Sequence, residues 1–124
     1  MEIGAQVTRT YIVSLDDTAM RHGSGDLDVL ATPRLVAMIE EVAKNFMSVE
    51  LINTETSVGT YIELKHLKAS AIGVEVQIRV ALKEKEGRKY TFVAQAYEGD
   101  VMIGEGLHTR FVVDKSRFIA GLNR

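Results

Sequence analysis

The chain has 124 residues, of which 46% are hydrophobic and 26% are charged. A chain of this length can bury a core of its own, so we expect one domain covering residues 1–124. The 15 basic and 17 acidic residues give a formal net charge of -2, which argues against nucleic-acid binding, because proteins that bind phosphate backbones usually carry a basic excess. Cysteine is absent, which excludes a disulfide scaffold.

Location is predicted from two further features. No segment approaches the roughly 18 to 20 consecutive apolar residues that span a bilayer, so we expect no membrane partner. Residues 1–4 lack the basic start and apolar stretch of a secretory signal. The sequence therefore favours a cytoplasmic location.

The first elements of the chain differ clearly in pattern. Residues 8–15 are rich in β-branched and aromatic side chains and are followed by two aspartates, which predicts a first strand at a sheet edge. Residues 21–28 contain two glycines among polar residues and have no helical or strand period, which indicates a loop.

A long amphipathic helix is predicted over residues 33 to about 51. Thr32 suits the N-cap position, and Pro33 suits the first helical position because it loses no hydrogen bond there. At 100° per residue, one broad face is apolar. Its members are Leu35, Val36, Ile39, Val42, Ala43, Phe46, Met47 and Val49. Such a helix is expected to lie on a sheet.

The rest of the chain alternates with a period of two and is interrupted by glycines. Strands are predicted over residues 58–68, 73–86, 88–98 and 101–113, with turns at Gly87 and at Gly99-Asp100. One strand, a long helix and four more strands indicate an α+β fold, with one helix on one face of an antiparallel sheet of about five strands.

Two adjacent glutamates of the helix have different surroundings in this pattern. Glu40 projects at the border of the apolar face, where loss of solvent can raise a carboxyl pKa and make the group a usable base or nucleophile. Glu41 points to the polar face. The alternative for Glu40 is an exposed glutamate on the flank of the helix.

The remaining candidates are a histidine, a threonine and a backbone segment. His66 lies in a strand and titrates near neutrality, although a packed strand histidine is the simpler explanation. Thr32 is either an N-cap or a hydroxyl that holds a substrate oxygen at the helix N-terminus. Gly59 and Thr60 can offer backbone N–H groups in the same way. Three scattered histidines and no cysteine give little support to a metal site.

Most of the chain, from residue 29 onward, shares an ordered set of features with a known family. In chain order they are Ala31-Thr32 at a helix start, Glu40 eight residues later, Gly59-Thr60 at a strand start, His66, Gly87-Arg88, and Ile103-Gly104 followed by Gly106, His108 and Arg110. Through them the sequence resembles the hot-dog-fold acyl-CoA thioesterases, in particular the group of the fluoroacetyl-CoA thioesterase. The resemblance implies a hot-dog fold with one long central helix on a curved sheet.

The resemblance also implies an activity and a site. It implies hydrolysis of an acyl-CoA thioester, with Thr32, Glu40 and His66 as the catalytic set. Coenzyme A is then part of the substrate, and no separate cofactor is needed. Gly59, Thr60 and Arg110 are implied as substrate-binding residues, with Arg110 near the phosphates together with Lys65, Lys68 or Arg88.

Two other functions remain open at this stage. One is a hot-dog protein that binds an acyl-CoA or another small ligand without turnover. The other is a hydratase or dehydratase, which the absence of a short motif pairing Asp with His disfavours. Residues 21–31 contain no aromatic side chain to close over a small acyl group, which argues against fluoroacetyl specificity.

We also expect a homodimer. A single curved sheet leaves edges that a second copy can cover. Thr32 and Glu40 are eight residues apart, which corresponds to roughly 12 Å along a helix axis and is too far for a direct hydrogen bond. The predicted site therefore combines groups from two protomers, or a substrate that bridges them.

Overall fold

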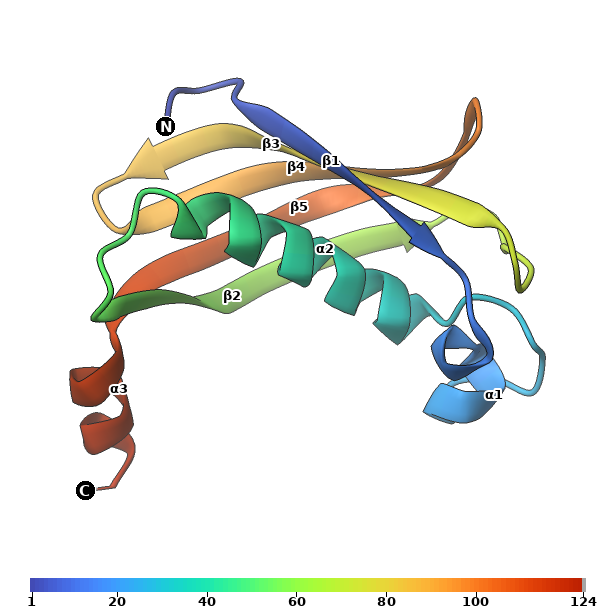
Figure 1. The fold of residues 1–124 in the computed structure, drawn as a ribbon, viewed down its shortest axis with the longest axis horizontal. Helices are drawn as coiled ribbons and strands as arrows, with labels where there is room; N and C mark the ends of the chain where they lie inside the picture. The colour runs from blue at the N-terminus through green and yellow to red at the C-terminus, as the bar shows by residue number, and fades with distance from the viewer. Residues whose placement is uncertain (124) are drawn as a thin grey trace.

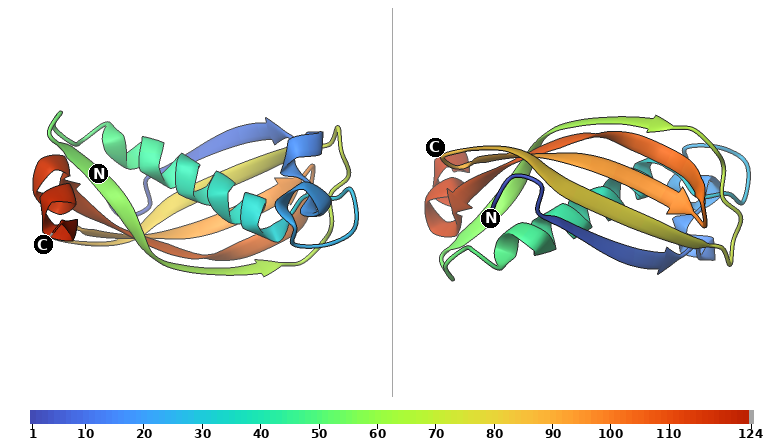
Figure 2. Two further views of the ribbon diagram at one scale, coloured as in Figure 1. Left: turned by 90° about the horizontal axis from the view of Figure 1, so that it is seen from below. Right: turned by 90° about the horizontal axis from the view of Figure 1, so that it is seen from above.

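The structure is a computed structural model that describes residues 1–123. Its elements are β1 (Gln6–Ile12), the 3-10 turn η1 (Leu15–Asp17), α1 (Ala19–His22), α2 (Thr32–Ser48), β2 (Glu55–His66), β3 (Glu75–Glu86), β4 (Lys89–Glu98), β5 (Val101–Asp114) and α3 (Lys115–Leu122). The five strands form one antiparallel sheet in the order β1-β3-β4-β5-β2. The sheet curves around α2, which crosses one of its faces (Figures 1 and 2).

This arrangement confirms the α+β fold with one long helix on a five-stranded antiparallel sheet. The predicted first strand does lie at an edge, and β2 forms the other edge. The tight turns fall where the sequence predicted them, because Gly87 and Gly99 have φ values of 60° and 58°, which side chains rarely tolerate.

The core lies between α2 and the concave face of the sheet. Along β3 the side chains alternate as predicted, with Val76, Ile78 and Val80 fully buried. The helix contributes six buried side chains, which are Leu35, Met38, Ile39, Val42, Ala43 and Met47. Phe92 of β4 fills the centre, so burial of apolar surface fixes α2 to the sheet.

Several predicted boundaries are wrong. The first strand ends at Ile12, because Ser14 and Asp17 cap a 3-10 turn in which Asp17 accepts from the Ser14 N–H at 2.8 Å. The predicted loop over residues 21–28 loses its first two residues to α1, which Thr18 caps. The strand predicted from residue 58 begins at Glu55, so β2 is longer at its start than the alternation indicated.

The long helix also ends earlier than predicted. It stops at Ser48, and Val49 is 80% exposed rather than part of the apolar face. Beyond this point the carboxylate of Glu50 is bound by Tyr90 at 2.8 Å and by Lys85 at 3.2 Å. These contacts hold the chain against the sheet, so it cannot continue along the helix axis.

Helix α3 was not predicted. The Asp114 side chain accepts a hydrogen bond from the Arg117 N–H at 3.0 Å and caps the helix start. None of the described residues of α3 is buried, and the helix has only eight residues, which is too short to show the periodic pattern on which the other predictions rest. Among residues 1–123, no helix is both long and apolar enough to cross a membrane.

Candidate active site

The start of α2 and the end of β2 meet through one hydrogen bond. The hydroxyl of Thr32 lies 2.7 Å from Nδ1 of His66. The prediction that Thr32 is the N-cap is therefore wrong. Ala31 holds that position, and its carbonyl accepts the Leu35 N–H at 3.0 Å. The Thr32 hydroxyl is turned sideways to β2 instead of toward the helix backbone.

His66 is half-buried, and this burial lowers the pKa of its imidazole, although the nearby backbone of Lys68 opposes the shift. The ring is therefore neutral near pH 7. Its second nitrogen, Nε2, is enclosed and has no hydrogen-bond partner among the described residues. Thr32 and His66 both line a pocket of about 290 Å³ beneath the segment that precedes α2. A neutral histidine with one unused nitrogen is suited to proton transfer.

Glu40 lies two turns farther along α2, beside β2 and β5. Its Oε2 atom is 3.7 Å from Nη1 of Arg110, and its side chain is 43% exposed. A Cβ atom at Gly59 would lie only 2.8 Å from the same oxygen. Glycine at this position therefore leaves the room that the carboxylate occupies.

Arg110 is buried beneath Glu40. Its Nε donates to the Ser57 hydroxyl at 2.8 Å, and its Nη2 donates to the Ser57 carbonyl at 2.9 Å. Only 6% of the residue is exposed. The expected role of Arg110 near the phosphates of coenzyme A stays a prediction. Its geometry suits a partner of Glu40.

His108 contacts Nη1, the terminal nitrogen of Arg110 that does not bind Ser57. Its Nδ1 lies 2.8 Å from the Tyr61 carbonyl, and its Nε2 lies 3.1 Å from Nη1 of Arg110. A carbonyl only accepts, so Nδ1 carries the proton and Nε2 accepts from Arg110. Burial lowers the pKa of His108, and the positive charge of Arg110 lowers it further. The ring is therefore neutral.

Sequence reasoning did not assign roles to Ser57 and His108. The signal that marks His108 is its strand parity, because His108, Arg110 and Val112 are all buried at alternate positions of β5. Two buried polar residues in such a row need partners, since an unpaired buried polar group is costly.

A bulge shapes the edge strand beside Glu40. The register of β2 against β5 shifts between Gly59 and Tyr61, so Thr60 has no cross-strand partner there. Its hydroxyl donates to the Thr109 carbonyl at 3.4 Å. Gly59 and Thr60 both lie exposed on the outer edge of the sheet. Their role in binding substrate through backbone N–H groups stays a prediction.

Glu41 belongs to a separate cluster. It accepts hydrogen bonds from Tyr11 and from Arg9 on β1. Burial and the bond to Glu41 raise the pKa of Tyr11 to about 12. Glu41 therefore ties the helix to β1 and does not simply face solvent, whereas Glu40 faces the opposite edge of the sheet.

The structure thus brings the predicted residues together in two groups. Thr32 contacts His66, and Glu40 contacts Arg110 beside Gly59. The two groups are roughly 12 Å apart along α2. Within residues 1–123, no group of three acidic, histidine or cysteine side chains is placed to hold a metal ion.

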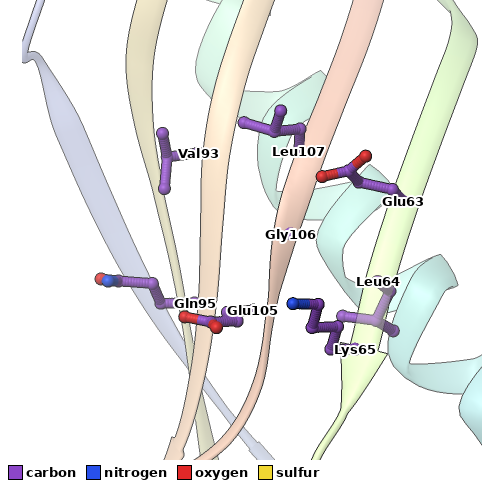
Figure 3. A pocket seen from close by; sticks show the side chains of 8 residues that line it. All are labelled: Glu63, Leu64, Lys65, Val93, Gln95, Glu105, Gly106 and Leu107. Carbon is purple, nitrogen blue, oxygen red and sulfur yellow. The ribbon is translucent and has the colours of Figure 1, made fainter.

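Another pocket, of about 360 Å³, lies on the opposite face of the sheet (Figure 3). Its residues come from β2, β4 and β5, and most of their side chains point away from α2, whereas Leu64 packs against the core. They include Glu63, Lys65, Gln95 and Glu105. None of the predicted catalytic residues lines it, so we do not assign the site there.

Comparison with known proteins identifies the family. The fluoroacetyl-CoA-specific thioesterase family matches residues 13–116, which include both groups of the site. The chain belongs to this family.

Individual relatives agree with the match. The fluoroacetyl-CoA thioesterase of Streptantibioticus cattleyicolor is 29% identical over 127 residues, which cover 97% of this chain and 91% of that protein. A solved structure of fluoroacetyl-CoA thioesterase is 27% identical and superposes with a TM-score of 0.94, covering 99% of this chain and 96% of that one. A variant of that thioesterase in complex with fluoroacetate and CoA is also 27% identical, with a TM-score of 0.89, and the match covers 95% of this chain and 99% of the variant. The fold is accordingly the hot-dog fold.

Proposed function

We propose that this protein hydrolyses the thioester bond of an acyl-CoA at a site formed by Thr32, Glu40 and His66. The observation that carries the proposal is the 2.7 Å contact between Thr32 and His66. It joins a neutral imidazole to a hydroxyl at the N-terminus of a long helix. Membership of the thioesterase family and the CoA complex of a related thioesterase support the substrate class.

The residues divide the chemistry between them. The Glu40 carboxylate either removes a proton from the attacking water, or attacks the thioester carbonyl to form an acyl anhydride that a water molecule then hydrolyses. Both routes give the free carboxylic acid and return Glu40 to its carboxylate form. In either route the carbon–sulfur bond breaks, and the departing thiolate of coenzyme A takes a proton, which His66 is placed to relay. The Thr32 hydroxyl and the positive end of the α2 dipole orient the thioester oxygen as negative charge develops on it.

The site needs a second copy of the chain in this proposal. Thr32 and His66 lie too far from Glu40 in one protomer to act on the same bond directly. Both groups border β2, a long edge strand that has no partner on its outer side among residues 1–123. Such an edge favours addition of another strand, and an identical strand gives a symmetric dimer. Pairing at β2 brings the Glu40 of one subunit toward His66 of the partner subunit.

No cofactor is required by this chemistry, because water is the second substrate and free coenzyme A is a product. We propose that the enzyme acts in the cytoplasm on a dissolved acyl-CoA, without a nucleic-acid or membrane partner. The balanced charge of -2 fits this environment.

Release of free thiol from a panel of short, branched and aromatic acyl-CoAs tests the function. Glu40→Gln and His66→Ala are each expected to lower turnover by at least about 100-fold. Glu41→Gln, on the same helix, is the matched control and is expected to stay within about twofold, because glutamine can still accept from Tyr11.

Two outcomes would contradict the proposal. Equal losses in the Glu40 and Glu41 variants would remove the special role of Glu40. Binding of acyl-CoA without release of thiol would instead support the non-catalytic alternative, a hot-dog protein that binds an acyl-CoA.

A further inference from the structure

Helix α3 carries an apolar face that the described chain leaves partly exposed. Phe118, Ile119 and Leu122 are 39%, 57% and 62% exposed. Positions 118 and 122 are one helical turn apart, and position 119 adjoins them, so the three side chains form one patch. The helix projects from the end of β5 away from the sheet, beyond the edge strand β2 (Figure 1).

We propose that this patch of α3 binds a second copy of the chain, on residues 23–28, and closes the pocket that holds Thr32 and His66. The inference rests on the dimer of the proposed function. In this arrangement, the partner subunit adds side chains to the site that a single protomer lacks.

The register of the sheet determines where α3 falls in such a dimer. Glu55 at the start of β2 pairs with Asp114, which directly precedes α3. Two β2 strands that pair across a two-fold axis run antiparallel, so the start of one lies beside the end of the other. Helix α3 of one subunit therefore comes to lie beside the His66 end of β2 in the other subunit.

The fold leaves room for this contact. Helices α3 and α1 extend at opposite ends of the sheet (Figure 1). Ser24, which follows α1, lines the same pocket as His66 at the end of β2, so a second copy that pairs with β2 passes close to this loop. The two-fold axis then places α3 of the partner subunit beside α1 and residues 23–28.

The two surfaces are complementary in charge and in polarity. Leu27 is 68% exposed and stands between Asp26 and Asp28. Within residues 1–123, neither aspartate forms an ion pair, and the guanidinium of Arg117 on α3 forms none either. The apolar patch of α3, with Arg117 beside it, thus faces Leu27, which lies between Asp26 and Asp28. This match of apolar and charged groups favours docking at this place.

Closure by α3 would change the pocket in a way that matters for substrate choice. The pocket of about 290 Å³ is lined by Ser24, Thr32, His66 and Leu67 among others, and residues 21–31 contain no aromatic side chain. Phe118 of the partner subunit supplies an aromatic wall at this place. Exclusion of water there also strengthens the electrostatic effect of the catalytic groups.

Cysteine crosslinking tests the placement directly, because the natural chain contains no cysteine. Two singly substituted proteins, Phe118→Cys and Leu27→Cys, are co-expressed with different tags and oxidised. We expect a disulfide-linked heterodimer on a non-reducing gel. The control replaces Leu27→Cys by Ile3→Cys, which is 64% exposed in the native chain and lies before β1, the opposite edge of the sheet. It should give no more than background crosslinking.

A monomeric protein, or a dimer in which the 27/118 pair crosslinks no better than the 3/118 pair, would overturn the inference. A second readout is catalytic. Phe118→Ala is expected to lower kcat/KM about tenfold for substrates with short acyl groups while the dimer persists. Crosslinking does not depend on turnover. An inactive protein that still crosslinks would therefore refute only the proposed function. An active protein that fails to crosslink would refute only the docking of α3.

Discussion

Arg110 donates a hydrogen bond to His108 across 3.1 Å in the interior of the protein, close to the carboxylate of Glu40. This contact requires the unprotonated Nε2 of His108, because a protonated ring would present a second donor to the guanidinium. The position of Arg110 against Glu40 therefore depends on the protonation state of His108, a residue that does not itself contact the substrate.

Replacement of His108 should separate this positioning role from simple packing. His108→Gln keeps an acceptor where Nε2 stands, whereas His108→Leu leaves one Arg110 donor unpaired in a buried place, which costs about 1–3 kcal/mol of unfolding free energy. We expect the leucine variant to lose thioesterase kcat about tenfold or more and the glutamine variant to recover most of it. Chemical denaturation and initial rates measure the two effects. Equal kcat in both variants would show that the contact with Arg110 does not matter.

Acid should destabilise the protein through the half-buried His66 and the buried His108. Burial lowers the pKa of both His66 and His108 below the ordinary value of 6.5. The unfolded chain therefore binds more protons than the folded one as the pH falls below about 6.5. Their contribution to stability is complete above that pH and is lost toward lower pH. Urea unfolding at a series of pH values measures this, and His108→Gln should reduce the slope between pH 6.5 and 5.

Gly59 offers a test of the space around Glu40. A Cβ atom there would meet the Glu40 carboxylate at 2.8 Å and Cε1 of the buried His108 at 3.2 Å. The carboxylate, at the end of a flexible side chain, can move away, and the His108 ring must give by only a few tenths of an ångström. Gly59→Ala is therefore expected to fold with a modest loss of melting temperature but to lose about tenfold or more in kcat. A large loss of stability with normal kcat per folded molecule would argue that the glycine serves the sheet and not the site.

The sequence predicted the parts of the fold that strong periodicity specifies. The alternation in β3 and the glycines at positions 87 and 99 placed the meander correctly, because one buried face and two tight turns leave little freedom. Helix ends were less predictable. The long helix stops at Ser48 because Glu50 finds partners on distant strands, and no local pattern reveals such contacts.

The candidate site was predictable only in part. The residue pattern made Thr32, Glu40 and His66 separate candidates, and only the resemblance to a family joined them into one catalytic set. The contact of the Thr32 hydroxyl with His66 in place of the helix backbone was not foreseen. Burial of Arg110 beneath Glu40 could not be foreseen from net charge or spacing, since it depends on Ser57 and His108 from two neighbouring strands.

The central claim is that one active site combines Glu40 of one subunit with Thr32 and His66 of the other. Subunit complementation tests it most directly. Glu40→Gln and His66→Ala, each inactive alone, are co-expressed with different tags so that mixed dimers form, and thiol release is measured. Random assembly makes half of the dimers mixed, each with one intact site, so we predict about a quarter of wild-type activity. Activity no greater than the average of the two inactive parents, in a sample shown to contain the mixed dimer, would contradict the shared site.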